Sequence, residues 1–125
     1  MTAALGIINT ELNSAGIPYE FMEWTDPVQY PYWVGEYSEV ATLTEDGYKE
    51  SAFILTGTTK GPWLELEQAR AKIEKRFPNP YGLRMATDGG AVVIHYENSF
   101  PVPTGEADLK RIQVNLKIKE WKEVI

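Results

Sequence analysis

The sequence of 125 residues contains no cysteine, a single histidine and no long apolar run. Without cysteine, the chain has no disulfide, no Cys-ligated zinc, no iron–sulfur cluster and no thiol nucleophile. No segment approaches the roughly 18 consecutive apolar residues that a membrane-spanning helix requires. The first residues, MTAALGIINTELNSAG, have no basic start and already include Glu11, unlike a secretory signal. We therefore expect a soluble, intracellular protein that does not bind a membrane.

Basic residues are also few, and their distribution is uneven. The chain has 12 Lys and Arg against 18 Asp and Glu, which gives a net charge of -6. Residues 1–61 hold nine acids and two bases, for a net charge of -7, whereas 62–125 hold nine acids and ten bases, for +1. Because such a surface repels phosphate, we expect no specific binding of nucleic acid.

The chain lacks a recognisable catalytic constellation. His95 lies in the strand-forming run AVVIHYE, and the pattern gives it no triad or metal-binding partner. Glu45 and Asp46 lie in TEDGYKE, where the Asp-Gly step is typical of a turn rather than of a metal-binding loop. We predict no catalytic residue, no cofactor and no metal site. An enzyme that combines His95 with carboxylates and tyrosines is the least favoured interpretation.

The spacing of apolar residues predicts two helices, one over residues 2–15 and one that follows Pro62. Gly16 and the nearby proline end the first helix, and acids followed by bases along the second suit the helix dipole. Each stripe has apolar side chains three or four positions apart: Leu5, Ile8, Leu12 and Ala15 in the first, and Leu66, Ala69, Ile73 and Phe77 in the second.

Runs of β-branched and aromatic residues predict the strands. The clearest is IQVNLKIK, which alternates strictly between apolar and polar residues and should bend or end near Glu120. Gly35 suggests a bulge, and SFPVPTGEAD a linker or proline-stiffened edge. The other predicted strands are 19–24, a hairpin of 32–43 with 48–57 around Glu45-Asp46-Gly47, and a hairpin of LRMAT with AVVIHYE around Asp88-Gly89-Gly90.

This order of elements predicts one α+β domain spanning residues 1–125. We expect two layers, with a mainly antiparallel sheet of five or six strands and two helices packed on one of its faces. The other face of the sheet is then left for solvent or for a partner.

Two groups of residues are candidate interfaces. Tyr30, Tyr32, Trp33 and Tyr37 crowd one short segment, where they either pack over the sheet and brace a proline-rich loop or form an exposed binding anchor. The polar face of the last strand carries a second group, Arg111, Lys117 and Lys119. It either keeps the protein soluble or meets the acidic half of a neighbouring copy.

The element order, together with the stretches PYWVGEYSE, FILTGTTKGPWLELE and ADLKRIQVNLKIKEW, resembles one family over nearly the whole chain. It is similar to the tail terminator and head-tail joining proteins of long-tailed bacteriophages and prophages, which include minor tail and tail-completion proteins. The resemblance implies a non-enzymatic virion protein that forms a ring, commonly a hexamer, during assembly in the host cytoplasm. Its implied partners are copies of itself, the tail tube protein and head-connector proteins.

If DNA passes through such a ring, an acidic bore prevents the phosphates from sticking to it. We therefore expect Glu45 and Asp46, or other acids of the first half, to lie at the bore or at the rim that faces the tube. The alternative function is a peptide- or protein-binding module of the host, with the aromatic cluster as its anchor. Exposed aromatics without self-association would favour that alternative.

Overall fold

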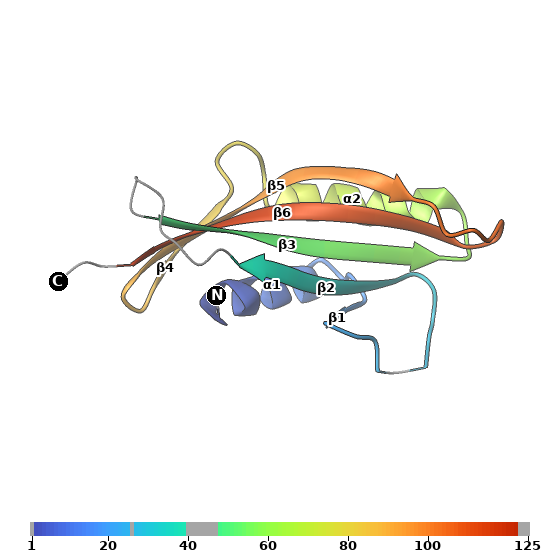
Figure 1. The fold of residues 1–125 in the computed structure, drawn as a ribbon, viewed down its shortest axis with the longest axis horizontal. Coiled ribbons are helices and arrows are strands. Elements are labelled where there is room, and N and C mark those ends of the chain that lie inside the picture. The colour runs from blue at the N-terminus through green and yellow to red at the C-terminus, as the bar shows by residue number, and fades with distance from the viewer. Residues whose placement is uncertain (1, 26, 40–47, 123–125) are drawn as a thin grey trace.

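The computed structural model of the chain describes residues 2–25, 27–39 and 48–122. The elements follow one another along the chain as a helix, three strands, a second helix and three more strands (Figure 1). The bounds are α1 Thr2–Ser14, β1 Tyr19–Phe21, β2 Tyr32–Glu39, β3 Tyr48–Thr59, α2 Trp63–Arg76, β4 Leu83–Thr87, β5 Gly90–Val102 and β6 Lys110–Lys122.

The six described strands form one mixed sheet in the order β1-β2-β3-β6-β5-β4, which curls into a half-barrel. All neighbouring strands are antiparallel except β1 and β2. These two are parallel because the proline-rich connection after β1 returns the chain to the end of the sheet at which β1 began (Figure 1). The predicted α+β class is confirmed, and the parallel pair makes the sheet mixed.

Strand β6 lies in the middle of the sheet and determines where the core forms. Its residues Ile112, Val114, Leu116 and Ile118 are buried and alternate with more accessible polar residues, as predicted. The strand ends at Lys122, two residues past Glu120, near which it was expected to bend or end. On either side of β6, strands β3 and β5 pair with it along almost its whole length.

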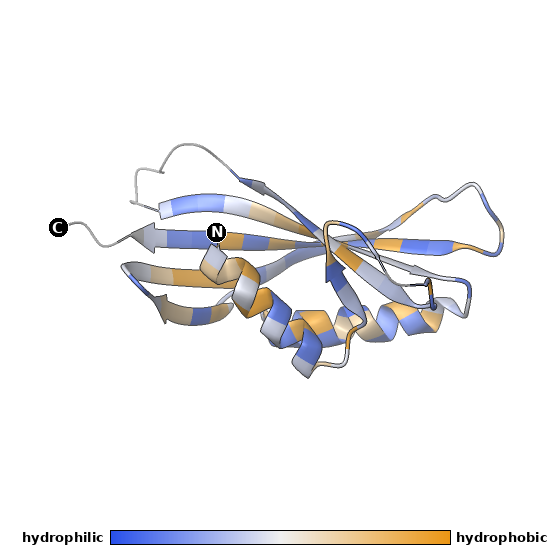
Figure 2. Ribbon diagram, turned by 90° about the horizontal axis from the view of Figure 1, so that it is seen from below, coloured by the Kyte–Doolittle hydropathy of each residue, from blue (hydrophilic) through white to orange (hydrophobic). Residues whose placement is uncertain are grey.

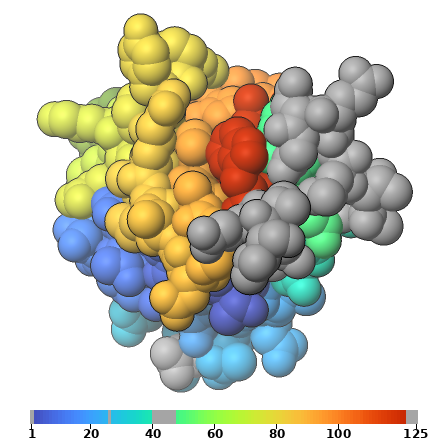
Figure 3. Space-filling model, turned by 90° about the vertical axis from the view of Figure 1, so that its left-hand side faces the viewer, coloured from blue at the N-terminus to red at the C-terminus, as the bar shows by residue number. Residues whose placement is uncertain are grey.

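One buried apolar cluster joins the sheet to both helices. Figure 2 shows α1 and α2 on the same side of the long strands, and Figure 3 shows α1 in blue next to α2 in yellow-green at one end. The helices contribute Ala4, Ile8 and Leu12 from α1 and Leu66 and Ile73 from α2; the strands contribute Trp33, Phe53, Leu55, Val92 and Ile94 with the four apolar residues of β6.

Both helices begin and end where the sequence predicts, to within a residue or two. After α1, Gly16 adopts a φ of +74°, and the Ile17 N–H donates to the carbonyl of Leu12 over 3.0 Å. A glycine in the left-handed conformation is a common way to end a helix. Leu12 and Ile17, on either side of this turn, are both buried in the core.

Two local predictions in the strands were wrong. β2 pairs with β3 without interruption from Tyr32 to Glu39, and the register irregularity lies instead in β5, between Tyr96 and Asn98. Glycine is needed at position 35 for space: a Cβ atom there would lie 2.5 Å from Cζ of Phe53. The first strand also stops early, at Phe21, because Met22 has a φ of 71° that cannot continue a strand.

Two other segments remain to be placed. The predicted linker or edge is in part strand, since β5 extends through Phe100 and Pro101 to Val102. The turn predicted at Glu45-Asp46-Gly47 falls outside the described residues.

Replacing Gly35 with alanine should destabilise the fold, because the new methyl group would lie 2.5 Å from Phe53 and 2.7 Å from Tyr19. We expect the free energy of unfolding to fall by about 1–3 kcal/mol, as measured by urea titration with tryptophan fluorescence. Gly6 is the matched control: it lies within α1 with no atom within 4 Å of an added Cβ. Gly6→Ala should therefore raise stability by about 0.5–1 kcal/mol. Equal stability of Gly35→Ala and wild type would contradict the packing described.

Candidate interaction surface

The four aromatic residues predicted as one cluster do not lie together. Trp33 and Tyr37 point to the helix-covered face of β2 and Tyr32 to the other face, because side chains alternate along a strand. Trp33 is fully buried, with its indole over Gly57, so it belongs to the core and cannot serve as an exposed anchor. The sequence prediction grouped these residues by position and did not apply the alternation.

Tyr30 and Tyr32 brace the proline-rich loop. The ring of Tyr32 lies 5.3 Å from that of Trp24 and 5.7 Å from that of Tyr30, centroid to centroid. The ammonium of Lys60 lies 5.5 Å from the centre of the Tyr30 ring, which fits a cation–π contact. These contacts hold the loop against the open face of the sheet, so this pair fits the bracing role that the sequence left as one of two interpretations.

Tyr37 takes part in a different contact, a stack of three rings across the edge of the sheet. Phe21 lies nearly parallel to Tyr37, with centroids 5.9 Å apart, and to Phe53, at 6.4 Å. Phe53 is fully buried, whereas Phe21 is 41% and Tyr37 42% exposed. The stack therefore begins in the core and ends at the surface, where Met22 adds a further exposed apolar side chain.

Phe21 and Met22 were missed by the sequence prediction. Their signal is present in YEFMEW, where Tyr19 and Phe21 share one face, but this run by itself predicts only a strand over 19–24. Because β1 stops at Phe21, its pairing with β2 also stops at Gly35. Along residues 36–38, no described strand covers the outer side of β2, and the exposed rings lie beside this uncovered edge.

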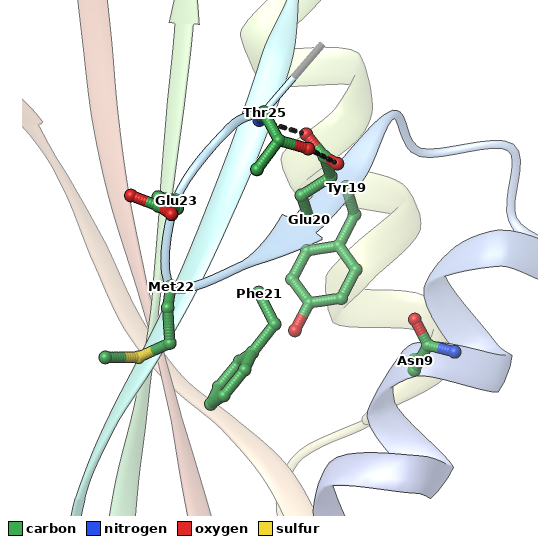
Figure 4. Close-up of a pocket in the computed structure, with 7 residues that line it drawn as sticks. All are labelled: Asn9, Tyr19, Glu20, Phe21, Met22, Glu23 and Thr25. Atoms are coloured by element: carbon green, nitrogen blue, oxygen red, sulfur yellow. Dashed lines mark hydrogen bonds between the residues drawn. The ribbon is translucent and has the colours of Figure 1, made fainter.

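A shallow hollow adjoins the stack, between β1, the turn after it and α1 (Figure 4). Its volume is about 590 Å³. The carboxylate of Glu20 accepts hydrogen bonds of 2.9 Å from both the backbone N–H and the hydroxyl of Thr25, which fixes the turn. The residues that line the hollow are Asn9, Tyr19, Glu20, Phe21, Met22, Glu23 and Thr25.

Negative charge surrounds these exposed apolar side chains. The first basic residue of the chain is Lys49, so α1, β1, β2 and the loop between the two strands contain acids but no base. Glu23 and Glu36 are both exposed. We call this surface the acidic edge. It spans both faces of the sheet edge, because the alternation that turns Phe21 and Tyr37 to the helix-covered face turns Glu20 and Glu36 to the open face. Its residues are Glu20, Phe21, Met22, Glu23, Glu36 and Tyr37. Apolar side chains within a rim of one charge are suited to binding a protein surface of opposite charge.

Each of the three predicted basic residues of β6 has a partner within the chain, and one of them, Lys117, is neutralised by carboxylates. Lys117 lies between two carboxylates, 3.4 Å from Glu97 and 3.8 Å from Glu50. The Arg111 guanidinium donates to the hydroxyl of Thr58 over 3.2 Å, and Lys119 lies 5.2 Å from the centre of the Tyr48 ring. These partners come from the flanking strands, so the sequence of β6 alone gives no sign of them.

The other predicted site residues give no site in the described part of the chain. Glu45 and Asp46, the predicted acidic bore or rim, lie outside the described residues. His95 pairs in register with Lys117, and its ring faces a backbone carbonyl, that of Tyr96, at 3.3 Å. Within residues 2–25, 27–39 and 48–122, no group of three or more His, Asp or Glu side chains is placed to hold a metal ion. Among the same residues, no helix is long and apolar enough to cross a membrane.

Comparison with known proteins gives a likeness of fold. No protein-family model matches the chain, and no curated protein matches its sequence. Among solved structures, it is similar to a chain described as "Virion of native gene transfer agent (GTA) particle". The TM-score is 0.70 at 11% identity, over 90% of both chains. A second solved structure has a TM-score of 0.68 at 16% identity, over 94% of this chain and 89% of the other. At these identities, the matches establish a shared fold.

The Tyr19 phenol beside the hollow should make stability depend on pH in the alkaline range. Burial raises the pKa of Tyr19 to about 12, whereas tyrosine in an unfolded chain titrates near 10. The stabilising contribution of the neutral phenol is therefore complete below about pH 10 and is lost as the pH rises through about 12. We expect Tyr19→Phe to lose less unfolding free energy than wild type between about pH 9 and 11.5, in paired urea titrations. Equal losses in the two proteins would show that the phenol is not shielded from water.

Proposed function

We propose that this protein is a structural component of a phage-like particle that acts at the head-tail junction. In this role it assembles into a ring that terminates the tail tube or joins it to the head, and it has no enzymatic activity. The particle would contain it as a virion protein after assembly in the host cytoplasm. Its partners would be other copies of itself, the tube protein and the connector proteins of the head.

The observation that carries the proposal is the fold likeness to a chain of the gene transfer agent particle. It extends over 90% of both chains at a TM-score of 0.70, so the whole element order is shared rather than one common motif. The same element order, together with the sequence stretches noted above, resembles the head-tail proteins of long-tailed phages.

The acidic edge is the surface that suits such an assembly. A ring forms when each copy uses one surface to contact a different surface of the next, and when the rotation between copies closes. Interfaces of this kind are centred on exposed aromatic and apolar side chains, as Phe21, Met22 and Tyr37 are here. We therefore assign Glu23 and Glu36 to the contact between copies rather than to the bore. The acidic bore remains a prediction for Glu45 and Asp46.

The proposal predicts concentration-dependent self-association that requires the exposed half of the ring stack. Wild-type protein should form closed oligomers as its concentration rises, which light scattering after size exclusion and negative-stain electron microscopy would detect. The double variant Phe21→Ser with Tyr37→Ser should raise the dissociation constant of the oligomer by about 30-fold or more, because it removes two apolar anchors.

Phe100→Ser provides the matched control, since Phe100 is 43% exposed but lies on β5, far across the sheet from β2. It should leave assembly within about threefold of wild type. Circular dichroism and urea unfolding of each variant would show whether the fold is retained. If both variants assemble like wild type, the acidic edge is not the contact between copies.

A monomer at every concentration would instead favour a peptide- or protein-binding module that uses the same exposed rings. Pull-down of purified tube or connector proteins, compared between wild type and the double variant, would then separate the two functions. Failure to bind either protein, together with the absence of a ring, would contradict the proposed role at the head-tail junction.

A further inference from the structure

Two neighbouring lysines on α2 lack the partners that the other described basic side chains have. Arg70, Arg76, Lys49 and Lys117 all form ion pairs with carboxylates of the chain. Arg84 donates a hydrogen bond to the carbonyl of Tyr81. Four further bases make hydrogen bonds or ring contacts: Lys60, Lys110, Arg111 and Lys119. Among the basic side chains that the structure describes, Lys72 and Lys75 alone have no such partner.

These lysines are exposed at the rim of a hollow between the C-terminal ends of the two helices. Its volume is about 420 Å³, and its α1 side consists of the small residues Ser14 and Ala15. Arg76 also lines it and bridges to Glu11 of α1 over 3.1 Å, so the two helices that form its walls are tied together. We call this surface the lysine groove; its residues are Ser14, Ala15, Lys72, Lys75 and Arg76.

Unpaired acids flank the exposed rings on the other side of α1. The carboxylates of Glu23 and Glu36, both in the acidic edge, have no ion pair or hydrogen bond within the described chain. The remaining described acids without a partner lie in turns between elements and away from the exposed rings: Asp88, Glu106 and Asp108. The acidic edge thus combines unpaired negative charge with exposed apolar side chains.

The two surfaces lie on opposite flanks of α1 and so cannot meet within one molecule. The flank of α1 that carries Asn9 faces the hollow at β1, whereas Ser14 and Ala15 face α2. Figure 3 shows this spatial order at one end of the molecule, where α1 (blue) lies between α2 (yellow-green) and the light-blue residues that follow β1. Two complementary surfaces that point in different directions are what a head-to-tail ring contact requires.

We infer that the acidic edge of one copy docks into the lysine groove of the next. Phe21 and Tyr37 cover the small-residue wall of the groove, while Glu23 and Glu36 meet Lys72 and Lys75. The inference rests on the proposed ring function and names the two surfaces that would form it. Charge complementarity of this kind sets the orientation of docking and increases the association rate, whereas the apolar contact contributes most of the affinity.

A charge-exchange experiment tests this pairing. The variant with Lys72→Glu and Lys75→Glu should raise the dissociation constant of the oligomer by about tenfold or more, because attraction becomes repulsion. The variant with Glu23→Lys and Glu36→Lys should weaken assembly similarly. Mixing these two variants in equal amounts should restore rings with an even number of copies, because alternating copies pair an acidic surface with a basic one at every contact. Combining all four substitutions in one chain should restore assembly to within about threefold of wild type.

The control is Lys60→Glu with Arg84→Glu, which changes the net charge by the same amount at exposed bases outside both surfaces. It should assemble like wild type. Because the chain contains no cysteine, a second readout is available: Glu36→Cys protein mixed with Lys75→Cys protein should form a disulfide-linked pair under mild oxidation. Lys60→Cys in place of Lys75→Cys should not.

The outcomes separate the two hypotheses. Wild-type rings that tolerate the lysine reversal as well as they tolerate the control would overturn the pairing and leave the ring function standing. Loss of assembly in both charge variants without recovery in the fourfold variant would also overturn it, because the two surfaces would then meet other partners. A wild-type chain that forms no ring at all would overturn the pairing, and it would overturn the proposed function as well if that chain also bound neither the tube protein nor the connector proteins.

Discussion

The fold depends on the register of strand β6 between β3 and β5. Ile112, Val114, Leu116 and Ile118 are buried on the helix side of the sheet, and both neighbouring strands must match them. A slip of one residue in either pairing would turn the apolar side chains to the other face. The register also determines where α1 and α2 can pack, because their buried residues share a single cluster with β6.

The exposed aromatic surface is a consequence of how this core ends at its edge. Phe53 lies in the core beside Gly35, whose missing side chain leaves room for the rings of Tyr19 and Phe53. Phe21 continues the stack outward, and the left-handed backbone of Met22 then ends β1. A longer β1 would have covered the outer edge of β2. The short strand instead leaves Phe21 half-covered, so the same stack that stabilises the edge also provides an anchor for a partner.

The sequence predicts the parts of this structure that depend on local periodicity. The stripes that contain Ile8 and Ile73 and the alternation of β6 each describe one element, and the structure contains them. Predictions failed where contacts between distant segments of the chain determine the local structure. Gly35 is explained by Phe53 and Tyr19, which lie on two other strands. The parallel pairing of β1 with β2 likewise depends on the path of a loop, which has no periodicity of its own.

In the candidate site, too, the sequence predicts local features but not the contacts between strands. Tyr37 was identified from composition, but its partner Phe21 was not, because the stack joins β1 to β2 across the sheet edge. The neutralisation of Lys117 was equally hidden, because Glu50 and Glu97 belong to different strands. A count of bases along β6 therefore overestimates how much positive charge that face offers to a partner.

The net charge of the chain is thus less informative than the charges that folding leaves unpaired. Most of the basic side chains that the structure describes contact a carboxylate, carbonyl, hydroxyl or ring, and the two described exceptions, Lys72 and Lys75, share one rim. Exposed ion pairs contribute little to stability, so leaving these lysines unpaired costs the monomer almost nothing. Glu23 and Glu36 also serve the monomer, because like charges around Phe21 and Tyr37 oppose contact between two acidic edges. The same acids thereby favour contact with a basic surface over contact between two like surfaces.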